Sequence, residues 1–240
     1  MKLTVLGRHG PYPAKGGSCS SYLLQDGKTN ILIDCGSGAL SNLPIGFDEI
    51  SAVILSHLHF DHISDALVLS YALQIQNMIR EIPKCRLYMP GEPAKTADLF
   101  KDIPYYDITE INDGMSIKID DISITFAKMI HPALCFASKF KKGGKTLVYS
   151  GDTAINENLI SFAKDADMLL IDCAILKKDH YKDSPHMSVF QAGEIAKLAN
   201  VKKLIGTHLF ELYSEDEILA ELKQNYNGAV LACENQSYLI

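Results

Sequence analysis

The chain has 240 residues, of which 47% are hydrophobic and 22% are charged, and its formal net charge is −6 at pH 7. This length allows one large domain or two small ones with a substantial core, and the composition is typical of a globular protein. The acidic balance disfavours a protein that holds a long nucleic acid through its phosphates, because such proteins are usually basic.

Hydrophobic periodicity predicts strands and helices that alternate along the whole chain. The predicted strands cover residues 3–6, 21–25, 30–34, 53–55, 85–89, 117–119, 122–127, 131–140, 146–149, 168–171 and 203–205, and two short strands follow near the end. The predicted helices cover residues 62–79, 93–100, 156–163, 189–198 and 215–224. No linker of low complexity divides the chain. We therefore predict one α/β or α+β domain over residues 1–240, with at least one large sheet.

The cysteines and the apolar runs indicate the cellular compartment. Six cysteines are scattered without a C-x-x-C pair, which is typical of free thiols in a reducing cytosol and disfavours a separate cysteine-based zinc site. The first apolar run, from Leu3 to Leu6, is too short for a signal peptide. No run approaches the roughly 18 apolar residues of a membrane span. We predict a cytoplasmic protein without a membrane partner.

The densest group of metal-binding side chains follows the predicted strand 53–55, in the segment Ser56-His57-Leu58-His59-Phe60-Asp61-His62. Two positions apart in extended chain, His57 and His59 project from the same face and can reach one metal ion. Asp61 and His62 follow where the chain turns into a helix, so they can serve a second ion. Imidazole and carboxylate suit zinc, manganese or iron. The alternative is a polar loop with surface histidines, which the density of donors disfavours.

Three more candidate ligands follow predicted strands at a distance along the chain. They are His131 before Pro132, Asp152 in a Ser-Gly-Asp-Thr segment, and His208 in a Gly-Thr-His segment. The end of a buried strand is a usual place for site residues on a rigid scaffold. Each residue alone could be an ordinary core or surface residue. Together with the first cluster they predict a single metal centre.

In order and spacing, these motifs resemble those of the metallo-β-lactamase-fold hydrolases, over nearly the whole chain. The resemblance implies an αββα sandwich, in which two mixed sheets pack together with helices outside and the site at one edge. It also implies a ligand set for two ions. The first ion would be bound by His57, His59 and His131, the second by Asp61, His62 and His208, and Asp152 would bridge both.

Several branches of that family fit the chain poorly. The β-lactamases usually have a cysteine where Asp152 stands, and they lack the histidine that matches His62. The oxygen-reducing diiron members usually have a glutamate at the position of His59. The glyoxalase-II thioesterases carry a helical extension, whereas only 32 residues follow His208 here.

A further segment, Pro185-His186-Met187-Ser188, resembles the His-Ser-Thr type segment of the ribonuclease Z branch, which acts on phosphodiesters. The resemblance implies that His186 lies beside the metals and assists at the scissile phosphate. The alternative is a surface histidine near a helix start, with Ser188 as the N-cap. Asp34 also matches that branch, as a residue that supports the site from behind, and Asp172 is a candidate to orient His186.

The spacing between two of the motifs disfavours transfer RNA as a substrate. Members that process transfer RNA carry a long arm between the positions of His131 and Asp152, whereas 20 residues separate them here. This is enough for a hairpin. Ribonuclease Z relatives are often dimers, so a homodimer is a candidate assembly for this chain. His9 and His180 are not expected to be ligands, and we expect His9 to be exposed to solvent.

We therefore predict a binuclear metal-dependent phosphodiesterase that acts on a small or cyclic phosphodiester or a short nucleic acid. Two divalent ions, with zinc favoured and manganese or iron open, would activate water and stabilise charge on the phosphate. Asp61 and His186 are the predicted catalytic residues: Asp61 orients the nucleophile, and His186 assists the leaving oxygen or the equatorial charge. The alternatives are a thioester or lactone hydrolase on the same centre, and a metal-binding scaffold without turnover.

Overall fold

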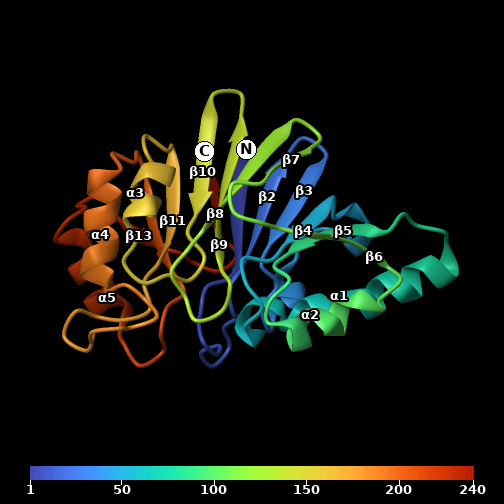
Figure 1. Cartoon of the computed structure of the whole chain (residues 1–240), viewed down its shortest axis with the longest axis horizontal. Coiled ribbons are helices and arrows are strands. Elements are labelled where there is room, and N and C mark those ends of the chain that lie inside the picture. Colours follow the sequence, from blue (N-terminus) through green and yellow to red (C-terminus); the bar gives the residue numbers. More distant parts are fainter.

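The computed structural model describes residues 1–240 and contains two seven-stranded sheets that pack face to face. Helices cover the outer face of each sheet, with α3, α4 and α5 at one side of the molecule and α1 and α2 at the other (Figure 1). This is the αββα sandwich of two mixed sheets that the sequence predicts, so the predicted fold class is confirmed.

The first sheet has the strand order β14-β1-β2-β3-β4-β5-β6. The pairs among β14, β1, β2 and β3 are antiparallel, and those from β3 to β6 are parallel. The strand bounds are β1 Lys2–Gly7, β2 Ser21–Asp26, β3 Thr29–Ile33, β4 Ala52–Ile54, β5 Cys85–Met89, β6 Tyr106–Glu110 and β14 Ser237–Leu239. Its outer face carries α1 (Phe60–Ile79), α2 (Ala94–Lys101) and two short 3₁₀ helices, η1 (Ala39–Asn42) and η2 (Phe47–Glu49).

The second sheet has the order β13-β12-β11-β10-β9-β8-β7, parallel from β10 to β13 and antiparallel from β7 to β10. Its strands are β7 Ser116–Ile119, β8 Ile122–Lys128, β9 Phe136–Lys142, β10 Lys145–Tyr149, β11 Met168–Asp172, β12 Leu204–Thr207 and β13 Val230–Leu231. The helices are α3 (Glu157–Phe162), α4 (Val189–Leu198) and α5 (Glu215–Lys223). No helix in the structure combines the length and apolarity that crossing a membrane requires.

Alternation along the strands divides the core into layers. In β3, Ile31 and Ile33 pack between the two sheets, whereas Leu32 packs against the helices outside the first sheet. In β11, Leu170 packs between the sheets and Leu169 packs under α4. Because successive side chains of a strand point to opposite faces, a run of apolar residues is buried on both sides. The apolar layer between the two sheets holds them in a fixed relative position, so the strand ends of one sheet are fixed relative to those of the other.

Three strands end in a residue with left-handed backbone, at the same edge of the sandwich. Asp34 follows β3 with φ 52°, Gly151 follows β10 with φ 59°, and His208 follows β12 with φ 56°. This conformation is uncommon for residues other than glycine, and such residues gather at functional sites. Asp34 and His208 themselves contact the candidate ligands, and Asp152 directly follows Gly151, so the three turns lie at the predicted site.

Two sequence predictions of strands were wrong in detail. The predicted strand 131–140 begins only at Phe136, and His131 lies in an irregular segment before it, where Pro132 offers no N–H for a ladder. Strand β6, Tyr106–Glu110, was not predicted. It lies at the edge of the first sheet, only its Tyr106 is buried, and its sequence Tyr-Asp-Ile-Thr-Glu has just two apolar residues, which is too weak a hydrophobic pattern to mark a strand.

Candidate metal centre

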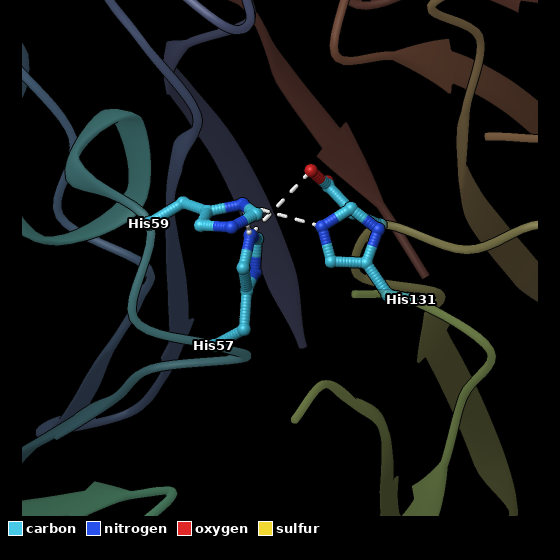
Figure 2. Close-up of side chains that lie close together, drawn as sticks. His57, His59 and His131 are labelled. Carbon is cyan, nitrogen blue, oxygen red and sulfur yellow. Dashed lines mark hydrogen bonds and ion pairs between the residues drawn. The ribbon is translucent and has the colours of Figure 1, made fainter. Parts of the chain in front are cut away.

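Three predicted ligands converge on one point at the edge of the sandwich: His57 and His59, which follow β4, and His131 from the β8–β9 connection (Figure 2). The Nδ1 atom of His59 lies 3.0 Å from Nε2 of His57 and 3.2 Å from Nε2 of His131. Nitrogen ligands about 2.0–2.1 Å from one tetrahedral ion lie about 3.3 Å from each other. The three ring nitrogens therefore have the spacing of ligands of one ion.

The proton on His131 is directed away from this point. Its Nδ1 atom donates to the carbonyl oxygen of Pro185 at 3.2 Å, which can only accept. In a neutral imidazole the Nε2 atom of His131 then carries a lone pair toward His59. Such a second contact is typical of histidines that bind metals, because it fixes both the tautomer and the ring orientation.

A second group lies beside the first and consists of Asp61, His62, Asp152 and His208. The Nε2 atom of His208 lies 3.2 Å from Asp61 Oδ2 and 3.3 Å from Asp152 Oδ2. The Nε2 atom of His62 lies 3.4 Å from Asp61 Oδ2 and 3.4 Å from Asp152 Oδ1. Asp152 also belongs to the first group, since its Oδ2 atom lies 3.6 Å from His57 Nε2. The geometry thus places Asp152 between the two groups.

Asp34 supports this centre from behind as a fully buried carboxylate. It accepts hydrogen bonds from the backbone N–H and the hydroxyl of Ser56 at 2.7 and 2.9 Å, and from the Tyr149 hydroxyl at 2.7 Å. It also accepts a hydrogen bond from Nδ1 of His62 at 2.7 Å. These contacts hold the His62 ring with its Nε2 atom toward Asp61 and Asp152.

The unpaired atoms of the site fit a cation. His62 Nε2 and Asp152 Oδ1 are buried and have no hydrogen-bond partner, although they lie 3.4 Å apart. In a neutral His62 that donates from Nδ1, both atoms present lone pairs, and burying unpaired acceptors against each other is costly. A divalent ion between them removes this cost. The donor set, all imidazole and carboxylate, suits zinc, manganese or iron.

The electrostatics of the site agree with this interpretation. Burial lowers the pKa of His57 well below its ordinary value and also lowers the pKa values of His59 and His131, so these rings are neutral and able to bind a cation. For His62, burial acts against the charged form, but the charges of Asp152 and Asp61 outweigh it and raise the pKa well above the ordinary value. The second group thus attracts positive charge, whether proton or metal ion.

His186 and Asp172 form a hydrogen-bonded pair next to both groups. The Nδ1 atom of His186 donates to Asp172 Oδ2 at 2.7 Å, and its ring lies 5.3 Å from His131 and 5.2 Å from His208 between centroids. Burial opposes the charged ring, but the charge of Asp172 and this hydrogen bond raise the pKa of His186 to about 9. His186 thus presents a proton-bearing Nε2 edge beside the candidate metal ligands. Ser188 does cap α4, so the cap and the site histidine coexist in this segment.

The structure brings together all eight predicted site residues. That they bind metal or act in catalysis remains a prediction. Their positions, in chain order, are His57, His59, Asp61, His62, His131, Asp152, His186 and His208. The expectation that His9 is exposed was wrong: it is buried, and its Nδ1 atom lies 3.5 Å from a carboxylate oxygen of Glu234.

Gly10 is a site residue that sequence reasoning missed. A Cβ atom built on it would lie 1.9 Å from Nε2 of His208, so the Gly10 backbone packs directly on this candidate ligand. The only signal in the sequence was its place in a loop rich in glycine and proline. Because many surface loops share that composition, the signal does not identify a site residue.

Comparisons with known proteins agree with this geometry. Residues 29–209 match a protein-family model described as Beta-lactamase superfamily domain. The chain belongs to the beta-lactamase superfamily. It has the metallo-β-lactamase fold, as predicted, and its similarity to ribonuclease Z proteins fits the predicted ribonuclease Z-like branch. The family is one of metallo-hydrolases, and the His/Asp cluster of this chain is suited to binding metal.

Individual relatives extend over nearly the whole chain. Probable metallo-hydrolase YhfI of Bacillus subtilis is 35% identical over 239 residues, covering 96% of each chain. The crystal structure of YhfI superposes with a TM-score of 0.93 at 30% identity, covering 99% of this chain and 98% of that one. Ribonuclease Z of Archaeoglobus fulgidus is 26% identical and covers 97% of this chain and 95% of the relative. The human short-form tRNase Z shares the fold, with a TM-score of 0.80 at 18% identity, covering 100% and 99%.

We predict that Asp34→Asn lowers metal affinity about 10- to 100-fold, the usual effect of losing a residue that orients a metal-binding histidine. Asparagine tolerates the left-handed backbone at this position, so the change removes charge and acceptor capacity without new backbone strain. Competition with a chromogenic chelator measures the affinity. Asp165→Asn, at an exposed left-handed position (φ 56°), is the matched control and should leave the metal affinity unchanged. Equal affinity in both variants would contradict the role of Asp34.

We further predict that Gly10→Ala disturbs the second group more than the first. The added methyl group collides with His208, so one bound ion per chain should be lost and hydrolysis should fall about 100-fold, as expected for a misplaced catalytic element. Elemental analysis of the purified variant measures metal per chain, and circular dichroism checks its fold. Gly228→Ala, whose added Cβ would have no neighbour nearer than 3.5 Å, is the control. Full metal content in Gly10→Ala would overturn the prediction.

Proposed function

We propose that the protein is a binuclear metal-dependent phosphodiesterase that acts on a small or cyclic phosphodiester or a short nucleic acid. The observation that carries the proposal is the His186–Asp172 pair beside the candidate metal ligands. A protonated imidazole next to a metal centre suits a reaction in which negative charge develops on phosphoryl oxygens. One relative is named ribonuclease Z, and a ribonuclease cleaves the phosphodiester bonds of RNA.

We assign the first ion to one group of three histidines and the second ion to the other group, with one carboxylate shared. The first ion would be held by His57, His59 and His131 and the second by Asp61, His62 and His208, and Asp152 would be shared between them. When bound, two divalent ions supply Lewis acidity that activates water and stabilises charge on the phosphate. Zinc is the favoured metal because imidazoles dominate the donor set, and manganese and iron are compatible with it.

The protein's own groups complete the reaction. Asp61 is held ionised, since burial, which would raise its pKa, is outweighed by His62 and His208, which lower it. In this state Asp61 can accept a hydrogen bond from the attacking water and orient it. His186, held by Asp172, donates a proton from Nε2 to the leaving oxygen or a hydrogen bond to an equatorial oxygen. After donation, the neighbouring carboxylate favours its reprotonation.

The preference for a small substrate rests on the β9–β10 hairpin. The segment between the two motifs contains only this hairpin, whose strands are joined by a turn at Gly143 and Gly144, so no arm extends from it to grip a folded RNA. The net charge of −6 also opposes binding to a long polyanion. We therefore propose neither transfer RNA nor other long nucleic acids as substrates, and no membrane partner.

We predict that His59→Ala and Asp152→Ala abolish hydrolysis of bis-p-nitrophenyl phosphate, because each removes a ligand of the proposed centre. His186→Ala should keep its metal and lose about 100- to 10,000-fold in kcat, the usual range for a lost general acid. Steady-state kinetics, with metal content measured on the same samples, provides the readout. Full activity in His59→Ala or Asp152→Ala would refute the proposal.

The same preparation can be assayed with diester, thioester and lactone substrates to decide among the rival functions. A phosphodiesterase should favour the diester, and His186→Ala should impair only that activity. Dominant thioester or lactone hydrolysis would favour a carboxylic ester hydrolase on the same centre. Stoichiometric metal without turnover of any substrate would identify a metal-binding scaffold.

We also propose a homodimer that pairs through the outer face of α1. From residue 66 to residue 79 this helix has no charged residue, and its exposed side includes Tyr71, Ile75 and Met78. Exposed apolar patches of this kind usually mark a protein–protein contact. Ile75→Asp should therefore shift the protein from dimer to monomer in sedimentation velocity, whereas Leu198→Asp on the exposed side of α4 should not. A monomeric unmodified protein would contradict the proposal.

A further inference from the structure

A cavity of about 590 Å³ lies directly beside the candidate metal centre. One wall contains His131, whose Nε2 atom faces His59 in the first group of ligands. Another wall is formed by the end of the β11–α4 connection, up to Pro185, and the next residue is His186. A phosphate held between the metals and His186 would therefore have one of its substituents next to this cavity, which we call the side cavity.

The wall formed by this connection is held in place by hydrogen bonds. The Ser184 N–H donates to the carbonyl oxygen of Tyr181 at 3.2 Å, which closes a turn. The Ser184 hydroxyl donates to the carbonyl oxygen of His186 at 2.7 Å. Pro185 accepts from His131 Nδ1 at 3.2 Å, which ties this wall to the other one. Tyr181 is thus linked structurally to His186 and to a candidate metal ligand.

Three large apolar side chains of the cavity wall lie open to solvent. Ile130 is 57% exposed, Ile155 is 50% exposed and Tyr181 is 58% exposed, and all three line the side cavity. Large apolar side chains that meet around one hollow beside a reactive centre are typical of a ligand site. His180 and Lys182 add polar groups to the same wall. The lining thus offers an aromatic ring and aliphatic surfaces together with hydrogen-bond donors.

The lining of the side cavity favours a flat aromatic substituent. A flat ring can stack on the tyrosine face and contact isoleucine side chains, while its polar edge meets hydrogen-bond donors. We propose that the side cavity binds a flat aromatic or heteroaromatic substituent of the phosphoester, such as a nucleobase, with Tyr181 and Ile155 as specificity-determining residues. The inference rests on the proposed function for the position of the phosphate, and it adds the class of substrate.

Binding of two phosphomonoesters to the zinc-loaded, full-length protein tests the inference. Adenosine 5′-monophosphate carries a base and ribose 5-phosphate lacks it, and calorimetry gives both dissociation constants. The unmodified protein should bind adenosine 5′-monophosphate about 10- to 100-fold more tightly, the usual range for stacking of one base. Tyr181→Ala should remove most of this preference and leave ribose 5-phosphate binding unchanged. Tyr181→Phe should keep the preference, because it retains the ring.

Tyr12→Ala is the matched comparison, since Tyr12 is an exposed tyrosine that packs on Phe210 outside the side cavity. It should not change the preference. Equal binding of the two phosphomonoesters, no binding of either, or a preference that survives Tyr181→Ala would each overturn the inference. Diester hydrolysis by the same protein is measured in parallel. A base preference without diester hydrolysis would refute the proposed phosphodiesterase and retain the aromatic site.

Discussion

The convergence of acceptor atoms on Asp152 is the constraint on which the rest of the site depends. Its two carboxylate oxygens lie 3.4 Å from His62 Nε2 and 3.3 Å from His208 Nε2. His62 donates its Nδ1 proton to Asp34, so in a neutral His62 the Nε2 atom and the facing Asp152 Oδ1 atom are both acceptors. Such a cluster is costly to bury, and a rigid framework has to hold it together until an ion neutralises it.

The two sheets provide that framework because each contributes part of the site and polar contacts join them beneath it. Asp34 follows a strand of the first sheet and accepts a hydrogen bond from Tyr149 in the second. Tyr22, in the first sheet, is hydrogen-bonded at 2.6 Å to Thr207, the residue before His208 in the second. Both tyrosines are fully buried and pack on each other at 5.1 Å between ring centroids. A shift of one sheet against the other would therefore break the candidate centre.

In our proposal, metal binding and substrate choice reside in different parts of the fold. The candidate ligands lie at strand ends and at the start of α1, where the core holds them. The β11–α4 connection instead carries His186 together with Tyr181 and the polar wall of the side cavity. Connections tolerate changes of sequence better than strands do. In our proposal, relatives with the same metal centre could thus act on different phosphoesters by varying this one segment.

The sequence alone predicted the fold class, which the structure confirms, and eight candidate site residues, which the structure brings together. Short motifs after apolar strands, such as Ser150-Gly151-Asp152-Thr153, are local patterns, and their order along the chain is specific to the family. The tertiary structure decided what depends on contacts between distant segments. It confirmed the candidate pair of His186 and Asp172, buried His9 against Glu234 and packed Gly10 on His208. It also formed the side cavity. Hydrophobic spacing predicts which side of an element is buried, but partners far apart in sequence meet only when the two sheets pack together.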